Sequence, residues 1–487
     1  MDGFIGVDVG TGSVRAGLII ADGTIIEVAS SSVIVTHPVP GYAVSSGENY
    51  YAALIETVSF VAKHAKNINI RGIAVGATGS SVVCSSKHGE LLSEVTLWMD
   101  DRSAEEAEFL TRETHEFTSS EWLPSKSLWI KSHDVNRWKD SYYVTELLDW
   151  INFKLSDQWV CSQCNVTCKW NDKGTRWSSN AEHMMDVFTK TPNISKKTGE
   201  AISLISENFA NMTGLPRDTI LVQGGIDAYL SMVATGGLVP GILSMTLGTS
   251  TVLLTSSLHP KQSDSVWGPF YEPLVKEAWV IEGGQISSGS VLNWIQDLCH
   301  ITHEDLSHQA QVLPPSADNL IMLENLQGNR TPHKDANARG SIVGLRLGHT
   351  PAHLYLAAME ATAMGIREAI EAVEACAGVE MDVIRLSGGG SCNRTWVQIH
   401  SDVLKRTLYI PEFPQHMGLI GAAMVASVGS GIHRDLYIAS SAMAPQYQVV
   451  QPRLNRSVLY EKMMNARRKL YRATNEITTL VCEASGE

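Results

Sequence analysis

The residues best suited to chemistry are carboxylates and hydroxyls that stand beside glycines at the ends of apolar runs. Asp8 lies at the end of the first such run, and Gly10, Thr11, Gly12 and Ser13 follow it. A carboxylate beside a phosphate-binding loop can hold Mg²⁺, an ion that usually keeps several of its own waters. The alternative is an aspartate that only accepts hydrogen bonds from the loop amides.

A second set of the same kind occurs in the other half of the chain. Gly248, Thr249 and Ser250 follow the apolar run 242–247, and another apolar run comes after them. Each set is typical of a strand, a glycine-rich tip and a returning strand. Main-chain amides and hydroxyls at such tips can hold phosphate. The repeat predicts two domains of like topology that face one another across a cleft.

A third glycine-rich turn follows the apolar run 383–386. Gly388, Gly389 and Gly390 stand there, and Asn393 is suited to cap the helix that comes next. Backbone without side chains can approach a ligand closely. One such turn could be nothing more than a turn, but the three together predict a nucleotide site. The Rossmann alternative is rejected, because position 15 is arginine and a hairpin follows instead of a helix.

Asp227 follows the apolar run 220–226, which breaks into two glycines. Phosphoryl transfer to an alcohol requires a carboxylate within hydrogen-bond reach of the attacking hydroxyl. A helix cap is an equally good explanation of this aspartate from the residues alone.

Trp98 and Asp100 form a polar cluster with Asp101 and Arg102. An aromatic ring can cover the apolar face of a sugar while a carboxylate accepts its hydroxyls, although the start of a solvated helix would look the same. The cysteines at 161, 164 and 168 resemble a metal motif, but too few further ligands accompany them, and buried free thiols are expected.

The elements that must position these residues belong to a globular chain. It has 487 residues, 44% of them apolar and 18% charged, which predicts two to four domains. The net charge of -13 disfavours nucleic acid and anionic membranes as partners. No apolar run is long enough to span a membrane, the N-terminus lacks a positively charged region, and cysteines are sparse, so a cytoplasmic protein is expected.

The domains are expected at 1–240 and 241–435, followed by a helical extension at 436–487. Turn residues cluster near the first boundary. The clearest helix is predicted over 351–378, with Thr350 as its cap and Gly378 at its end. The sequence does not specify an oligomeric state and leaves a homodimer open.

Taken together, the motifs resemble those of the FGGY carbohydrate kinases, and within them the ribulokinase-like branch that phosphorylates pentuloses and pentitols. The matching stretches occur in family order and are GVDVGTGSVRAG (6–17), LWMDDR (97–102), CKW (168–170), GGIDA (224–228), LGTST (247–251), WGPF (267–270), EGGQ (282–285), GNRTP (328–332) and SGGGSCN (387–393).

The resemblance implies an α/β fold of two ribonuclease-H-like domains, of the actin, Hsp70 and sugar-kinase type, that close about a hinge. ATP would lie mainly on the second domain and a small sugar or polyol mainly on the first. It also implies a role for each candidate residue. Asp227 is the catalytic base, Asp8 the magnesium-site carboxylate, Gly10 to Ser13 and Gly248 to Ser250 the phosphate-binding hairpins, Gly388 to Gly390 with Asn393 the adenosine-side turn, and Trp98, Asp100, Lys169 and Glu282 the lining of the sugar pocket.

The implied reaction is ATP-dependent phosphorylation of a free pentulose, with D-ribulose as the first candidate. Ribitol, xylulose and erythritol stay open as substrates. An ATPase switch of the same fold and a sugar-binding regulator without catalysis are the alternatives from other classes. One departure bears on the substrate: relatives read DATCS where this chain has Gly76 and Gly79 in GATGS. We expect the lost carboxylate and the added space to change which polyol fits.

Overall fold

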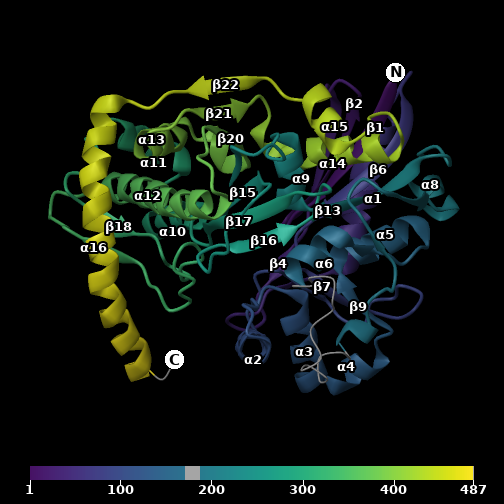
Figure 1. Ribbon diagram of the computed structural model, residues 1–487, viewed down its shortest axis with the longest axis horizontal. Coiled ribbons are helices and arrows are strands. Elements are labelled where there is room, and N and C mark those ends of the chain that lie inside the picture. The colour runs from purple at the N-terminus through teal and green to yellow at the C-terminus, as the bar shows by residue number, and fades with distance from the viewer. Residues whose placement is uncertain (171–186, 486–487) are drawn as a thin grey trace. The chain divides into compact units, whose positions relative to one another are not determined.

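The structure is a computed structural model that describes residues 1–170 and 187–485 (Figure 1). It divides into two compact units, and each is assembled from several stretches of the chain. Unit 1 contains Met1–Gly236, Phe270–Ala278 and Gly418–Ala444. Unit 2 contains Gly237–Pro269, Trp279–Met417 and Pro445–Glu487. The units are therefore not the continuous segments expected from the sequence, because a late stretch of chain returns to unit 1.

The main sheet of unit 1 has six strands. In spatial order they are β12 (Ala201–Leu204), β13 (Ile220–Ile226), β6 (Asn69–Ala77), β1 (Asp2–Val9), β2 (Ser13–Ile20) and β3 (Ile25–Ser32). Strands β1, β6 and β13 are parallel, while β2 and β3 run antiparallel to their neighbours. The carboxyl ends of the three parallel strands therefore meet at one edge, where ligands of open α/β sheets bind.

The main sheet of unit 2 repeats this arrangement. In spatial order its strands are β16 (Trp267–Tyr271), β17 (Trp279–Gln285), β15 (Thr251–Ser257), β14 (Ile242–Leu247), β20 (Val383–Ser387), β21 (Leu408–Pro411) and β22 (Tyr447–Val450). From β17 to β22 the strand directions match those from β3 to β12 in unit 1. The prediction of two α/β domains of like, ribonuclease-H-like topology is confirmed.

Smaller sheets and helices complete unit 1. A sheet of short strands contains β4 (Val35–Thr36), β5 (Val44–Ser45), β8 (Val95–Thr96), β7 (Val82–Ser85) and β9 (Tyr143–Glu146), and β10 (Cys161–Ser162) pairs with β11 (Ser195–Lys196). The helices are α1 (Gly47–Ala62), α2 (Ala104–Thr114), α3 (Leu123–His133), α4 (Val135–Asp140), α5 (Leu147–Ser156), α6 (Gln163–Lys169), α8 (Glu207–Thr213), α9 (Asp227–Ala234), α14 (Met417–Gly429) and α15 (Leu436–Ala442).

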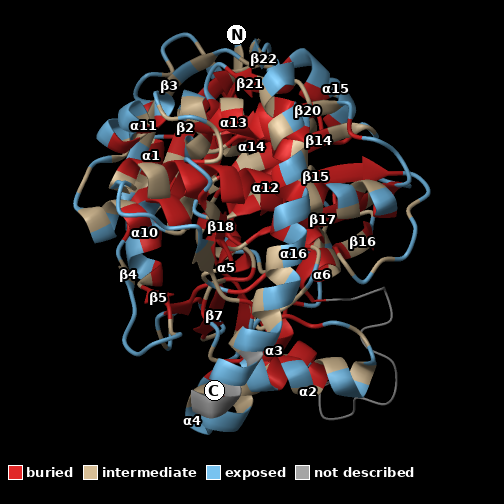
Figure 2. Cartoon of the chain, turned by 90° about the vertical axis from the view of Figure 1, so that its left-hand side faces the viewer, coloured by how far each residue is buried: buried red, intermediate tan, exposed pale blue. Residues whose placement is uncertain are grey.

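The core of unit 2 is built around α12 (Pro351–Ala377), the helix predicted from periodicity. Thr350 and His353 form a capping box at its start, and Gly378 ends it with a φ of 71°. Most of its residues are buried (Figure 2). The other elements are α10 (Gly289–Cys299), α11 (His303–Gln311), α13 (Arg394–Leu404), the paired strands β18 (Ile321–Leu323) and β19 (Ser341–Val343), and the 3-10 turns η1 (Gly389–Cys392) and η2 (Pro414–His416).

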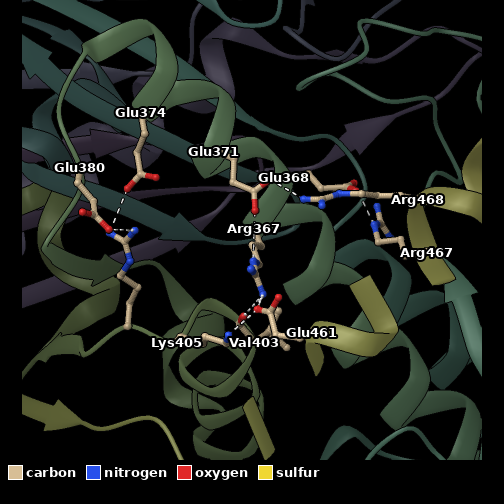
Figure 3. A network of polar contacts seen from close by, with 11 residues as sticks. Arg367, Glu368, Glu371, Glu374, Glu380, Val403, Lys405, Glu461, Arg467 and Arg468 are labelled. Carbon is tan, nitrogen blue, oxygen red and sulfur yellow. Dashed lines mark hydrogen bonds and ion pairs between the residues drawn. The ribbon is translucent and has the colours of Figure 1, made fainter. Parts of the chain in front are cut away.

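The C-terminal segment ends in α16 (Leu454–Ser485), which packs against α13 and β18 of unit 2. Arginines and glutamates join it to α12, as Figure 3 shows. Arg467 is 1% exposed and pairs with Glu324 at 2.6 Å and with Glu368 at 3.0 Å. Within the described part of the chain, no helix has both the length and the apolar character needed to cross a membrane.

Candidate active site

The first glycine-rich tip, Gly10 to Ser13, joins β1 to β2, and Asp8 stands just before it. Asp8 lies opposite Arg15 in the hairpin, and an ion pair of 3.6 Å joins the two side chains. Burial raises the pKa of Asp8, and Arg15 partly opposes that change. Position 418 in α14 is glycine, where a Cβ atom would lie 3.2 Å from the carboxyl carbon of Asp8.

The Asp8 carboxylate fits a divalent cation that is held mostly by waters and phosphate oxygens. Its side chain is 15% exposed, and a nearby cation would favour its charged form. No group of three or more histidines, cysteines, aspartates and glutamates that could hold a metal occurs in residues 1–170 and 187–485. Mg²⁺ commonly binds through one or two carboxylates and substrate phosphates, so a single carboxylate is sufficient for it.

Two side chains from other elements hold the first tip. Tyr50 of α1 donates a hydrogen bond of 2.6 Å to the carbonyl oxygen of Thr11. Trp98 donates from its indole Nε1 to the Thr11 hydroxyl at 3.0 Å. The tip itself is closed by a bond from the Gly10 amide to the Ser13 carbonyl, and Gly12 is exposed. The structure thus brings together a residue expected at the sugar and a residue expected at the phosphates.

Asp100 is fully buried, and both of its carboxylate oxygens are engaged. They accept hydrogen bonds of 2.7 and 2.6 Å from the Arg102 guanidinium and one of 2.6 Å from the Ala43 amide. Arg102 in turn lies 3.9 Å from the centre of the Tyr42 ring. These bonds fix the segment that carries Trp98, while a direct contact of Asp100 with sugar stays a prediction.

Asp227 is the first residue of α9 and directly follows β13. Its side chain is half-buried, and its Oδ1 accepts a hydrogen bond from the Ala228 amide at 2.7 Å. A Cβ atom at Gly76, the residue opposite Asp8 on β6, would lie 3.6 Å from the Asp227 Cα. Asp8 and Asp227 therefore stand at the ends of strands that only β6 separates.

The expected gain of space at Gly76 is wrong. A Cβ atom there would lie 2.8 Å from the side chain of Leu230, so α9 already fills the volume. At Gly79, a Cβ atom would lie 3.0 Å from Nδ2 of Asn165 and 3.1 Å from Cγ1 of Ile226. The departures from DATCS thus remove the carboxylate and the thiol that relatives have at these two positions, and they leave no void at Gly76.

Lys169 is the last residue of α6 and is 3% exposed. Its charge is close enough to lower the pKa of the buried carboxyl of Glu146, which burial raises to about 7. The Cys161, Cys164 and Cys168 thiols of this region are free and buried, as predicted.

The second tip, Gly248 to Ser250, joins β14 to β15 in unit 2. The Gly248 amide donates to the Ser250 carbonyl at 2.9 Å, and Thr249 is exposed. The start of α10 packs against this tip, because the Gly289 amide donates to the Gly248 carbonyl at 3.0 Å. The backbone of the tip is thereby held in place while its outer surface stays open.

The glycine turn, Gly388 to Gly390, lies beside the second tip. A Cβ atom at Gly388 would be 2.3 Å from the carbonyl oxygen of Leu247, at the end of β14. Gly389 has no atom within 4 Å of its Cβ position, so its surface is open. Asn393 caps α13 as predicted, accepting from the Trp396 amide, and it also donates to Ser307.

Glu282 is buried in β17, where it stands opposite Leu254 of β15. It belongs to unit 2, with the second tip and the glycine turn. Trp98, Lys169 and Asp227 belong to unit 1. The structure therefore groups the predicted residues in two sets, and Glu282 is the one sugar-pocket candidate outside unit 1.

Both halves of the chain match one family. The N-terminal domain of the FGGY family of carbohydrate kinases matches residues 4–234, and its C-terminal domain matches residues 243–430. The chain belongs to this family. It is an ATP-dependent carbohydrate kinase, and the two-domain fold is the one that this family shares with actin and Hsp70.

The relatives of this kinase cover nearly its whole length. An FGGY carbohydrate kinase domain-containing protein of Xenopus laevis is 26% identical, with 94% of each chain covered. A xylulose kinase of Staphylococcus xylosus is 25% identical, covering 96% of this chain and 99% of its own. A ribulokinase of Staphylococcus aureus is 24% identical, with 88% and 87% covered.

Solved structures of carbohydrate kinases share the fold. A gluconate kinase from Lactobacillus acidophilus superposes with a TM-score of 0.84 at 21% identity, covering 97% of this chain and 98% of its own. A Plasmodium falciparum glycerol kinase with ADP superposes with a TM-score of 0.80 at 18% identity, with 98% of each chain covered.

This kinase also has buried polar residues beside the candidate site that sequence reasoning missed. Glu146 of β9 accepts hydrogen bonds from the Ser80 hydroxyl at 2.6 Å and from the Trp170 indole at 2.9 Å. Lys126 of α3 donates from Nζ to the Ser80 carbonyl at 2.9 Å, and burial lowers its pKa to about 8. Neither residue lies in a recognisable motif. The one signal in the sequence was that Glu146 is a charged residue within the mostly apolar stretch 144–148.

Proposed function

We propose that this kinase phosphorylates a free pentulose or pentitol, with D-ribulose as the first candidate and Asp227 as the general base. The observation that carries the assignment is the place of Asp227, half-buried at the start of α9 and one strand away from the end of β1. A carboxylate that is held there by its own backbone but not fully buried can still reach a substrate hydroxyl.

In the proposed reaction Asp227 accepts the proton of a sugar hydroxyl as the hydroxyl oxygen attacks the γ-phosphorus of ATP. The bond between the γ-phosphorus and the bridging oxygen breaks, and ADP leaves with that oxygen. Amides and hydroxyls of the two tips stabilise the charge on the transferred group. Mg²⁺, which Asp8 would hold, supplies further charge neutralisation when bound.

In this proposal Trp98, Lys169 and Glu282 contact the sugar. An indole ring offers an apolar surface, while an ammonium and a carboxylate make directional hydrogen bonds with hydroxyls. Relatives that are xylulose kinases and ribulokinases support a pentulose. D-Xylulose is the second candidate, because two of these relatives are xylulose kinases. A cytoplasmic enzyme, as a monomer or homodimer, is consistent with these features.

The test is a coupled assay of ADP release with ATP and Mg²⁺ over pentuloses, pentitols, erythritol, gluconate and glycerol. We expect saturable release with a pentulose or pentitol, well above the rate without sugar. Preference for gluconate or glycerol would overturn the pentulose assignment while leaving the kinase intact. A rate that no polyol changes would contradict the proposed reaction.

A further inference from the structure

Asn165 of α6 has a buried side chain whose hydrogen-bonding capacity is unused. The residue is 1% exposed, and neither its Oδ1 nor its Nδ2 has a hydrogen-bond partner. Its backbone amide donates to the Ser162 hydroxyl at the start of the helix. Buried amide groups are nearly always satisfied, so an unsatisfied one requires an explanation.

The unused amide is costly for the fold. Burying an amide without a hydrogen-bond partner destabilises a fold, because the group gives up its bonds to water and gains none in return. An apolar residue of the same size would avoid this cost, and the neighbouring Cys164, Val166 and Cys168 show that α6 accepts apolar side chains. The asparagine is therefore best explained by something that binds it.

The position of Asn165 indicates what it binds. Its Nδ2 lies 3.0 Å from the point where a Cβ atom of Gly79 would be, and Ile226 borders the same point at 3.1 Å. Ile226 immediately precedes Asp227, the proposed base. Gly79 comes shortly after β6. The segment that carries it is joined to the end of β1 by a hydrogen bond from the Thr78 amide to the Val9 carbonyl. The amide thus belongs to the edge of the sheet at which the sugar is proposed to bind.

An amide suits a sugar better than it suits phosphate. It offers two donors on nitrogen and an acceptor on oxygen, so it can donate to one hydroxyl and accept from the next. A phosphate group offers only acceptors at neutral pH and would leave Oδ1 unpaired. On the side of Gly79 the amide faces backbone and the apolar side chain of Ile226, neither of which gives it a hydrogen bond.

We propose that Asn165 is a specificity-determining residue of this kinase, which hydrogen-bonds vicinal hydroxyls of the polyol through both ends of its amide. The inference rests on the proposed function and adds to it a residue that selects the substrate by its hydroxyls. A site that pairs with a hydroxyl rejects the analogue that lacks it, because the amide is then left unpaired again.

The test replaces Asn165 with leucine, which has nearly the same shape but no polar atoms. Loss of two neutral hydrogen bonds predicts a rise of roughly 5- to 150-fold in the KM for the best sugar of the panel, since each bond contributes about 0.5–1.5 kcal/mol. The KM for ATP should stay within about twofold of the parent value. The melting temperature without sugar should be equal or higher, because the unpaired amide is gone. Asn165→Ala is a second variant in case leucine does not fit.

Asn152→Leu is the matched control. Asn152 is also a fully buried asparagine, and its Oδ1 has no partner either, but its Nδ2 donates to Gln223 Oε1 at 3.4 Å within the fold. We expect this variant to lower the melting temperature and to leave the KM for sugar unchanged. The two asparagines thus predict opposite patterns of stability and substrate binding.

An unchanged sugar KM in Asn165→Leu and Asn165→Ala overturns the proposal, and so does an equal rise for sugar and ATP with a lower melting temperature. The latter would show a structural role or an internal water.

If the parent protein releases no ADP with any polyol, the proposed reaction fails, and sugar-induced shifts of the melting temperature become the readout. A polyol that stabilises the parent but not Asn165→Leu would then still support Asn165 as its ligand, whereas equal shifts in both would overturn it.

Discussion

The indole nitrogen of Trp98 and the hydroxyl of Thr11 are joined by a hydrogen bond of 3.0 Å, although the residues are 87 positions apart. Trp98 is a candidate for contact with sugar, and Thr11 is at the tip expected to contact phosphate. A sugar that moves the indole ring would therefore also act on the tip. This bond offers a short physical route between the two substrates within unit 1.

Replacing Thr11 with valine tests that bond. The variant keeps the shape of the side chain but removes the acceptor for the Trp98 indole, and loss of one neutral hydrogen bond predicts a fall in kcat/KM of about 3- to 10-fold. Thr11→Ser, which keeps the hydroxyl, should stay within about twofold of the parent. Steady-state kinetics with both substrates varied will decide, and equal activity in Thr11→Val and Thr11→Ser would show that the bond has no role in turnover.

Asp227→Asn should remove nearly all turnover. An amide cannot accept the hydroxyl proton, and loss of a general base typically costs about 10²–10⁴-fold in rate. ATP binding, measured by calorimetry, should be little changed. Asp218→Asn is the control, because Asp218 is exposed just before the other end of β13. Substantial sugar phosphorylation by Asp227→Asn would mean that another group is the base.

Lys169→Met should raise the KM for sugar far more than the KM for ATP. Methionine keeps the length of the side chain and loses a charged donor, whose hydrogen bonds contribute about 1.5–3 kcal/mol, or roughly 10- to 150-fold. Lys190, whose Nζ donates to the Ser141 carbonyl, provides the control variant Lys190→Met. Equal changes of the two KM values would place Lys169 outside the sugar pocket.

The buried carboxyl of Glu360 in α12 should make the stability of unit 2 depend on pH. Its Oε1 accepts from Tyr460 and from the Ser316 amide, both at 2.8 Å, and burial raises its pKa from 4.5 to about 7. A raised carboxyl pKa means that the stability from this group is complete below about pH 4.5 and is lost as the pH rises through 7.

Glu360→Gln removes that titration. Relative to the parent, the variant should gain stability between pH 5 and 8, by up to about 3 kcal/mol for a pKa difference of this size. Denaturant unfolding at several pH values measures the difference. A stability difference between Glu360→Gln and the parent that does not change with pH would show that the Glu360 carboxyl is not protonated in the fold.

Adjacent arginines of α16 predict very different effects on stability. Arg467 is 1% exposed and compensates the buried Glu324, so Arg467→Met should cost about 3–5 kcal/mol. Arg468 is 44% exposed and pairs with Glu371 at 2.7 Å, so Arg468→Met should cost less than about 1 kcal/mol (Figure 3). Denaturant unfolding of both variants gives the comparison, and similar losses would contradict the buried role of Arg467.

Much of the fold follows from local signals in the sequence. The glycine-rich tips, the helix from Pro351 and the cap at Asn393 are encoded by residues that are close in the chain, and the structure contains them as predicted. The apolar run 220–226 also placed Asp227 at the end of a strand, where the structure has it.

Long-range contacts could not be predicted in this way. The return of Gly418–Ala444 to unit 1 depends on packing between segments that are hundreds of residues apart. The volume above Gly76 depends on Leu230, and the pairing of Asp100 with the Ala43 amide depends on a loop from elsewhere. The unused amide of Asn165 was invisible for the same reason, because absence of a partner is a property of the whole neighbourhood.

The buried pair of Arg467 and Glu324 has a consequence for synthesis on the ribosome. Domains generally fold as units while the chain emerges from its N-terminus, and an uncompensated buried charge is strongly destabilising. Glu324 therefore has no compensating charge until Arg467, 143 residues later in the chain, has been synthesised. Unit 1 is likewise incomplete until Gly418–Ala444 has been synthesised. Neither half can be completed early in translation, so a nascent chain released before α16 should be a target for chaperones and proteases.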